Sequence, residues 1–239
     1  MPAERTKRST PRVVISGGPA AGKTAVVELI RRHLDAEVVT VPEAATILFS
    51  GGFPRAEDPR GRRAVQRAVF AVQRATEEIF AARSKGRPLV CDRGSLDGAA
   101  YWSGGLAAFC REMKTTPALE LARYDAVIFL ESTAYDVKSW PNGQPHRAES
   151  PAEACLLDRK LRKVWSAHPR FHYIPHAKNF YEKVALCLIT LHRVLGVGSS
   201  EGVAADAARA AVAAVESGGP PTVSATRARK GRPRARRSP

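Results

Sequence analysis

Eight consecutive residues near the start of the chain have the types and the spacing of a phosphate-binding loop. They match G-x-x-x-x-G-K-[ST] and are Gly17, Gly18, Pro19, Ala20, Ala21, Gly22, Lys23 and Thr24. The glycines let successive backbone N–H groups face one anion, and a following helix adds the positive end of its dipole. Lys23 would reach the β- and γ-phosphates and Thr24 would hold Mg²⁺, although Pro19 has no N–H to donate. The loop therefore predicts a bound nucleoside triphosphate.

A second pair of candidate residues follows an apolar segment at residues 89–91. Asp92 would lie at the carboxyl end of a strand, where a doubly wound sheet opens onto its ligand. Its carboxylate could hold Mg²⁺ or accept the proton of an attacking hydroxyl. Arg93 could neutralise phosphate charge with its planar guanidinium. The alternative is a local ion pair at a solvated strand end.

Four further side chains are candidates for contact with a second, small-molecule substrate: Glu43, Gln73, Asp97 and Tyr101. Glu43 follows the second expected strand and would face the same rim, as a second metal-shell group, a substrate-hydroxyl group or a surface carboxylate. Gln73, on a long helix, could hydrogen-bond a base or lie on a solvated face. Asp97 and Tyr101 are one helical turn apart and could touch substrate, or could be a helix cap and a core aromatic.

A loop of about twenty residues is expected between positions 131 and 150, because this stretch contains Pro141, Asn142-Gly143 and Pro145. A connection of that length suggests a lid over a site. Arg147 in this loop could swing onto the transferring phosphate. The catalytic candidates are therefore Lys23, Asp92, Arg93 and Arg147, and the metal-binding candidates are Thr24 and Asp92.

The elements that position these residues alternate between strand and helix. Strands are expected at 13–16, 37–41, 89–92, 126–130 and 171–174, and helices after the loop to about 34 and at 58–84, 96–102, 150–167 and 180–195. A polar connection is expected before the fourth strand. The apolar stripe of the long helix is expected to contain Val65, Val69, Val72, Thr76, Ile79 and Phe80. This alternation predicts an α/β fold with a mostly parallel sheet covered on both faces.

The charge of the chain is concentrated at its two ends. The formal net charge is +15, and residues 217–239 contain seven Arg or Lys residues and no acid. We therefore expect a basic disordered N-terminus at 1–11, a P-loop ATP-binding domain at 12–196, an Ala-rich linker or helix at 197–216 and a basic disordered tail at 217–239. The tail could make weak contact with nucleic acid or anionic lipid.

The rest of the composition favours an ordinary cytoplasmic protein. Its four cysteines lie far apart and have mostly apolar neighbours, which indicates reduced core residues. No apolar run approaches the ~20 residues that would span a bilayer, so no transmembrane segment is expected.

Several segments together resemble one family: 17–24, 41–46, 66–73, 91–101, 124–128, 146–149 and 165–169. Over residues 12–195 the chain is similar to the AAA-type P-loop family that groups nicotinamide riboside kinase domains of NAD-biosynthesis regulators with a fly protein needed for photoreceptor channel translocation. The resemblance implies a three-layer P-loop NTPase fold like that of nucleoside and nucleotide kinases, with five parallel strands in the order 2-3-1-4-5. Ring-forming AAA motors carry a strand that ends in Asp-Glu, whereas here strands end in Cys91-Asp92-Arg93 and Leu130-Glu131-Ser132.

Two functional hypotheses follow. The first is a kinase that transfers the γ-phosphate of ATP, with Mg²⁺, to a nucleoside-like substrate. The second is a regulatory ATP- or GTP-binding protein, an NTPase or switch, that contacts acidic lipid or nucleic acid through basic surfaces; by resemblance, the fly-type member binds GTP and acidic phospholipid. The choice of nucleotide stays open, and the absence of an Asn/Thr-Lys-x-Asp guanine motif favours ATP.

Overall fold

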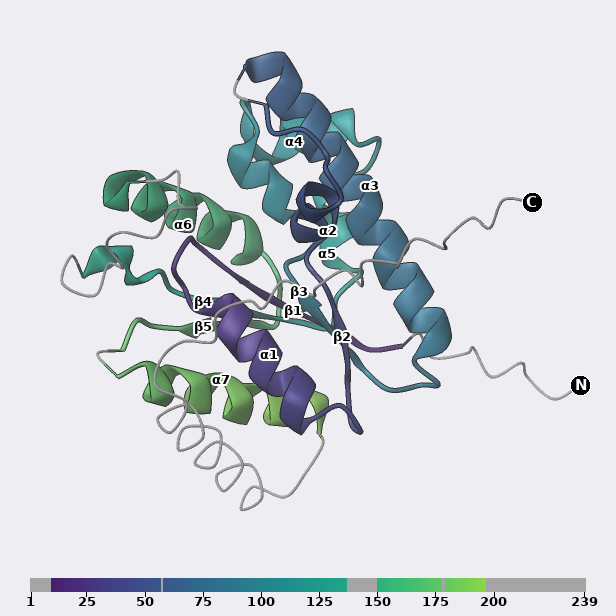
Figure 1. Ribbon diagram of the computed structural model, residues 1–239, viewed down its shortest axis with the longest axis vertical. Coiled ribbons are helices and arrows are strands. Elements are labelled where there is room, and N and C mark those ends of the chain that lie inside the picture. The colour runs from purple at the N-terminus through teal and green to yellow at the C-terminus, as the bar shows by residue number, and fades with distance from the viewer. Residues whose placement is uncertain (1–9, 57, 137–149, 178, 197–239) are drawn as a thin grey trace, which may run out of the picture.

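The computed structural model describes residues 10–56, 58–136, 150–177 and 179–196, which form a five-stranded sheet with helices on both faces (Figure 1). The strands are β1 (Arg12–Gly17), β2 (Val39–Val41), β3 (Leu89–Asp92), β4 (Ala126–Leu130) and β5 (Phe171–Ile174). All are parallel and follow the order β2-β3-β1-β4-β5. The predicted three-layer α/β P-loop NTPase fold is confirmed.

The centre of the sheet is apolar because helices cover it on both sides. Val13 and Ile15 of β1 pack with α1 (Lys23–His33) and α7 (Phe180–Leu195), whereas Val14 packs with helices on the opposite face. Side chains of a strand alternate between the two faces of a sheet, so neighbouring residues of β1 enter different cores. Strands buried on both faces read as continuous apolar runs, which explains why they were easy to locate in the sequence.

The opposite face carries α3 (Pro59–Arg83), α4 (Gly105–Glu112) and α6 (Pro151–Trp165), together with the short helices α2 (Ala44–Ser50), α5 (Pro117–Leu121), η1 (Asp97–Tyr101) and η2 (Thr133–Tyr135). In Figure 1, α3 runs as one long helix beside α2 and α4, above the sheet. This position places the N-terminal half of α3 close to α2 and η1, with which it forms a pocket.

The connection before β4 is more ordered than the predicted polar segment. It contains α4, which buries Phe109 and Cys110, and α5, which begins at Pro117 after a Thr116 cap. The Thr116 hydroxyl accepts a hydrogen bond from Leu119 N, and proline is favoured at the first helical position. Thr116-Pro117 is therefore typical of a helix start, but α5 is too short to show helical periodicity in the sequence.

The buried face of α3 differs from the predicted apolar stripe. It contains Val65, Phe70, Gln73 and Glu77, whereas Ile79 is 50% exposed. The helix is rotated because Gln73 and Glu77 join a buried hydrogen-bond network with Tyr124, and hydrogen bonding offsets the cost of burying polar groups.

Gly94 is required by a close approach between the β3–η1 turn and α6. A Cβ atom at this position would lie 2.7 Å from ring carbons of Trp165 and 3.0 Å from Val14 Cγ2. Both neighbours are completely buried and cannot move aside.

We expect Gly94→Ala to lower the free energy of unfolding by about 2–3 kcal/mol in denaturant titrations. At Gly86, where φ is +86° but a Cβ would meet open space, alanine should cost only about 1 kcal/mol. Equal costs at the two positions would contradict this explanation.

No described helix has both the length and the apolar character needed to cross a bilayer.

Candidate functional site

The phosphate-binding loop is held in shape by close packing at two of its glycines. Gly17 has a φ of +150°, and a Cβ there would lie 2.1 Å from the Leu130 carbonyl oxygen of β4. Gly22 has a φ of +89°, and a Cβ would lie 2.6 Å from the Phe180 ring of α7. Only glycine fits both the conformation and the space. The loop therefore passes tightly between β4 and α7 before α1 begins.

The first turn of α1 has the features of an anion site. The N–H groups at the start of a helix have no acceptor within the helix, and the first turn of α1 contains no acidic residue that would compete for them. Lys23 Nζ donates to the carbonyl oxygens of Gly17 (2.8 Å) and Gly18 (2.7 Å). Burial and the Arg93 charge lower the pKa of Lys23 to about 7, although Asp92 and Glu43 act in the opposite direction. Its ammonium group therefore lies in the same electrostatic environment as the residues that end β2 and β3.

Asp92 ends β3 beside the loop, with its backbone in register with Ile15 of β1. Its carboxylate makes no hydrogen bond or ion pair with the part of the chain that the structure describes. Burial and the nearby Glu43 carboxylate raise the pKa of Asp92 to about 6, against the opposing charges of Arg93 and Lys23. An unpaired carboxylate of this kind can take up a proton or a cation near neutral pH.

Arg93 joins the strand ends into one ion-pair cluster. Its φ is +67°, an uncommon conformation for arginine, and this backbone turn directs the side chain across the site. Nε lies 2.5 Å from Glu43 Oε1, and Nη1 lies 3.0 Å from Asp97 Oδ2. Burial alone would raise the pKa of Glu43, but the Arg93 charge and a 2.6 Å hydrogen bond from Thr46 Oγ1 hold it below its ordinary value. Glu43 is therefore ionised and rigidly placed.

Asp97 and Gln73 serve mainly to hold Arg93. Asp97 is 5% exposed and accepts hydrogen bonds from Ser16 Oγ and from Trp165 Nε1 (2.7 Å) as well as from Arg93. Gln73 is 2% exposed, and its amide donates to the Arg93 carbonyl (3.2 Å) and to Glu77. The contacts of Gln73 therefore place it in the scaffold beneath Arg93, away from the surface where a substrate would bind. Asp97 keeps one side toward the pocket described next.

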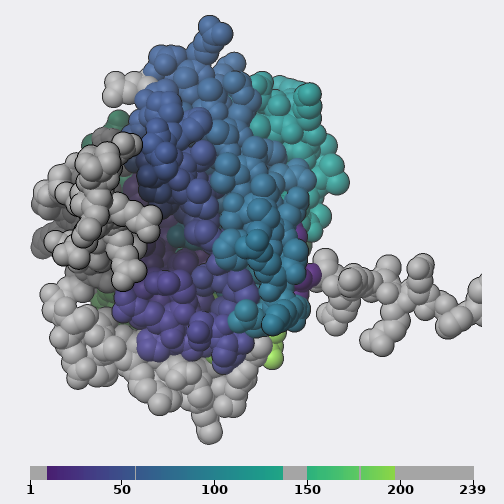
Figure 2. All heavy atoms as spheres, turned by 45° about the vertical axis from the view of Figure 1, so that its right-hand side comes forward, coloured from purple at the N-terminus to yellow at the C-terminus, as the bar shows by residue number. Residues whose placement is uncertain are grey.

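A pocket of about 770 Å³ opens on the other side of Arg93, between α2, α3 and η1. Figure 2 shows α2 and α3, in blue, above the purple α1. The walls include the following side chains: Glu43, Thr46, Phe49, Arg55, Arg62, Gln66, Arg93, Asp97 and Tyr101. Tyr101 is 39% exposed and forms part of the wall, so it is not the core aromatic of the alternative interpretation. The volume suits a ligand of mononucleotide size.

Gln66 approaches the pocket from α3 because Gly98 leaves room for it. A Cβ at Gly98 would lie 2.8 Å from Gln66 Oε1. Gln66 and Gln73 are seven residues apart, a spacing close to two helical turns, so both lie on one side of α3. The sequence pointed to this pair, but the member on the pocket wall is Gln66.

Asp158 is a site residue that sequence reasoning missed. It is completely buried on α6, and its Oδ1 accepts from Gly18 N and from Ser132 N, each at 3.0 Å. Burial raises the pKa of this carboxyl group. Asp158 thus ties the loop to the end of β4, where Ser132 Oγ also donates to the Pro19 carbonyl at 2.5 Å. No motif marks it, because an aspartate within an amphipathic helix usually faces solvent.

We expect Asp158→Ala to weaken ATP binding about tenfold or more. The substitution leaves two buried N–H groups without an acceptor, at about 1–3 kcal/mol for each, and releases the first half of the loop. Asp158→Asn keeps an oxygen in the Oδ1 position and should bind ATP nearly as tightly as the wild type. Calorimetric titration measures both affinities; equal weakening in the two variants would show that the charge of Asp158, rather than its acceptor geometry, is what matters.

Outside the described residues lie Arg147 with most of the expected lid, residues 1–9 of the basic N-terminus, the Ala-rich segment at 197–216 and the basic tail at 217–239. The interpretations placed on them stay predictions.

Comparison with known proteins identifies the class. A family model described as an AAA domain matches residues 12–183, and the chain belongs to this family. No curated protein matches the chain. Together with the parallel sheet and the loop at 17–24, the match defines a P-loop AAA-type domain, a class whose common property is nucleotide binding.

Proposed function

We propose that this protein is a small-molecule kinase that transfers the γ-phosphate of ATP to a hydroxyl group of a nucleoside-like substrate. The observation that carries the proposal is the position of Arg93, which faces the Lys23 site on one side and the wall of the 770 Å³ pocket on the other. A phosphate on the loop and an acceptor in the pocket would therefore meet at Arg93 and the Asp92 carboxylate. Phosphoryl transfer depends chiefly on such positioning and on charge neutralisation.

The proposed reaction assigns a separate task to each group. The acceptor hydroxyl oxygen bonds to the γ-phosphorus, the bond from that phosphorus to the β–γ bridging oxygen breaks, and ADP leaves. The hydroxyl proton passes to Asp92, whose raised pKa suits a base near neutral pH. Lys23 and Arg93 offset the charge on the transferring group. Glu43, fixed by Arg93 and Thr46, would orient the hydroxyl.

The residues present also fit Mg²⁺. Thr24 is exposed on the first turn of α1 and would hold the ion directly. The Asp92 carboxylate, which has no protein partner among the described residues, would hold it through water and stay free to act as the base. Mg²⁺ prefers hard oxygen ligands and is usually held by one or two protein groups together with substrate phosphates, so a dedicated cage is unnecessary. When bound, it would neutralise negative charge on the phosphates.

The contacts at the end of β4 favour phosphoryl transfer to an acceptor over ATP hydrolysis by an activated water, the reaction of an AAA motor. Glu131 follows β4, and its Oε2 accepts from His176 N at 2.8 Å while its carbonyl oxygen accepts from Lys183 Nζ. Lys183 is 2% exposed. These contacts use Glu131 as a structural link between β4 and α7, so it is poorly suited to activate water.

The test is acceptor-dependent formation of ADP. The protein is incubated with ATP and Mg²⁺, alone and with each of a panel of nucleosides, nucleotides and nicotinamide riboside. The proposal expects at least one acceptor to raise the ADP rate well above the rate without acceptor. ADP formed at one rate throughout would instead indicate an NTPase. If no ADP forms, and liposome or DNA binding is lost when residues 217–239 are deleted, the regulatory hypothesis replaces the kinase.

A further inference from the structure

We propose that the acceptor carries a phosphate group of its own, held by Arg55 and Arg62 at the end of the pocket remote from Arg93. This inference rests on the proposed function, because it takes the bound molecule to be the acceptor of the γ-phosphoryl group. The phosphate-binding site itself can be tested without any transfer.

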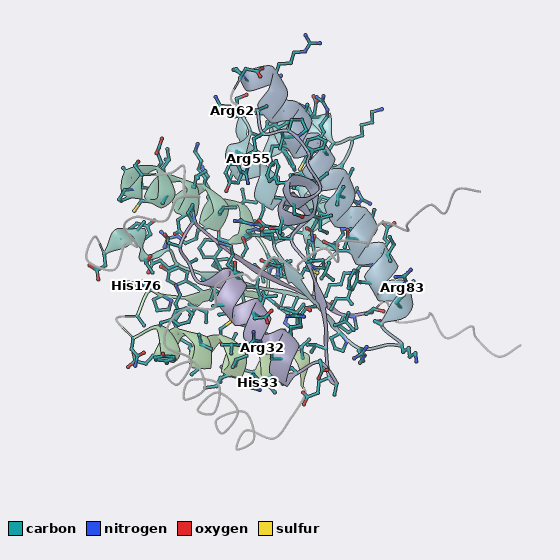
Figure 3. All side chains as sticks on the ribbon, viewed as in Figure 1. Arg32, His33, Arg55, Arg62, Arg83 and His176 are labelled. Carbon is teal, nitrogen blue, oxygen red and sulfur yellow. The ribbon has the colours of Figure 1, made fainter. Side chains whose placement is uncertain are left out.

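The two arginines come from segments that are packed together. Arg55 lies in the connection between α2 and α3, and Arg62 lies in the first turns of α3. The connection touches α3 at Gly61, where a Cβ would lie only 2.5 Å from Ala56 Cβ. Both arginines line the same pocket, and Figure 3 shows them near each other at the upper end of the α2–α3 unit. Their guanidinium groups therefore serve one region of the pocket wall.

Neither guanidinium is neutralised by a carboxylate of the described chain. Arg55 instead lies over the Phe49 ring, with Cζ 4.2 Å from the centroid, and Arg62 makes no ion pair with any residue that the structure describes. Two of the five other arginines of α3 do have a carboxylate partner: Arg67 pairs with Glu112 and Arg74 pairs with Glu120, each at 3.0 Å. The acidic groups of the pocket, Glu43 and Asp97, are both engaged by Arg93. Among the described residues, this end of the pocket thus presents positive charge that no carboxylate pairs with.

The chemistry of this end matches an oxyanion. Guanidinium groups bind phosphate and carboxylate through two parallel hydrogen bonds. Stacking on the aromatic ring holds the Arg55 guanidinium in one orientation before a ligand binds. Two such forks on one wall suit a phosphate, which offers three oxygens, better than a carboxylate, which offers two.

Arg62 and the residue that supports Arg93 lie at different levels of α3. Gln73 contacts the Arg93 carbonyl, and Arg62 lies eleven residues earlier on α3, about 16 Å away along the axis. The bound phosphate is therefore separate from the atom that accepts the γ-phosphoryl group. Gln66 and Tyr101 lie on the wall for the body of the molecule. The acceptor we infer is a phosphate monoester of nucleotide size with a free hydroxyl at its opposite end.

The binding test uses matched pairs of ligands with saturating ADP present to fill the loop. The probes are inorganic phosphate, neutral nucleosides with their 5′-monophosphates, and the same nucleosides with a 5′-carboxylate. We expect at least one monophosphate to bind tenfold or more tightly than its nucleoside, and more tightly than its carboxylate, by calorimetric titration. In the double variant Arg55→Gln/Arg62→Gln, this advantage should disappear while ADP affinity stays unchanged.

Arg83→Gln is the matched control, because Arg83 is an exposed arginine at the opposite end of α3 (Figure 3). It should keep the full advantage of the monophosphate. The inference is overturned if neutral nucleosides bind as well as their phosphates, if neither phosphate nor any monophosphate binds, or if the double variant behaves like Arg83→Gln. Transfer to neutral nucleosides alone would overturn this inference but support the proposed kinase function. Arginine-dependent phosphate binding without any transfer would support this inference but contradict the kinase function.

Discussion

Replacing Lys23 by methionine is expected to reduce phosphoryl transfer about 10²–10³-fold and to weaken ATP binding as well. Methionine keeps the apolar stem and removes the ammonium group, which interacts with Asp92 and donates to the loop carbonyls. A preorganised cation beside a transferring phosphate is worth several kcal/mol in a site that excludes water, and losing one such donor typically costs this much in rate. Initial rates and the ATP dissociation constant measure the two effects.

The matched control is Lys85→Met, an exposed lysine just after α3. It changes the net charge equally and should leave rate and affinity unchanged. If Lys23→Met bound and transferred like this control, the loop would not be the phosphate site, and the nucleotide-binding assignment would have to be abandoned.

Asp92→Asn is expected to lower the transfer rate about 10³-fold and, at neutral pH, to make the ligand-free protein more stable. The amide cannot accept the acceptor's proton and is a poor ligand for Mg²⁺, and loss of a general base alone typically costs 10²–10⁴-fold. The stability gain has an electrostatic cause. Burial and Glu43 disfavour the ionised carboxylate, and the neutral amide removes that unfavourable interaction.

The predicted stability gain of Asp92→Asn depends on pH. The pKa of Asp92 rises from 3.8 to about 6 on folding, so the folded state holds the proton more tightly than the unfolded state. The stabilisation by that proton is complete below pH 3.8 and is lost as pH rises through 6, by about 3 kcal/mol. The melting temperature of Asp92→Asn should therefore match the wild type near pH 4 and exceed it above pH 6.5. An Asp92→Asn protein that is less stable at pH 7.5 would show that Asp92 is a structural ion-pair partner.

The sequence predicted the sheet and the triphosphate loop because both are local. The strands are continuous apolar runs, and the loop is a contiguous motif whose glycines meet the conformational needs of one turn. The order 2-3-1-4-5 came from the family resemblance, and the structure confirms it. Glu43, Asp92 and Arg93 were identified as candidates because each follows a parallel strand, and strand ends meet at one edge.

What the sequence could not supply were contacts between distant segments. Asp158 reaches Gly18 across 140 positions, and Trp165 reaches Asp97 across 68. Gln73 was a plausible substrate contact by its type, and only the rotation of α3 shows that it supports Arg93 while Gln66 faces the pocket. Arg55 and Arg62 belong to no recognisable motif. They become candidates only because the structure shows that neither pairs with a carboxylate of the described residues.

The central claim is that a small molecule in the pocket receives the γ-phosphate held by the loop. The most direct measurement follows the label from [γ-³²P]ATP, with Mg²⁺ and the panel of nucleosides and their monophosphates, and separates the products by chromatography. We predict label in one new small organic phosphate, formed by the wild type and reduced at least 10²-fold in both Lys23→Met and Asp92→Asn. Label found only in inorganic phosphate, or only in unreacted ATP, would contradict the claim.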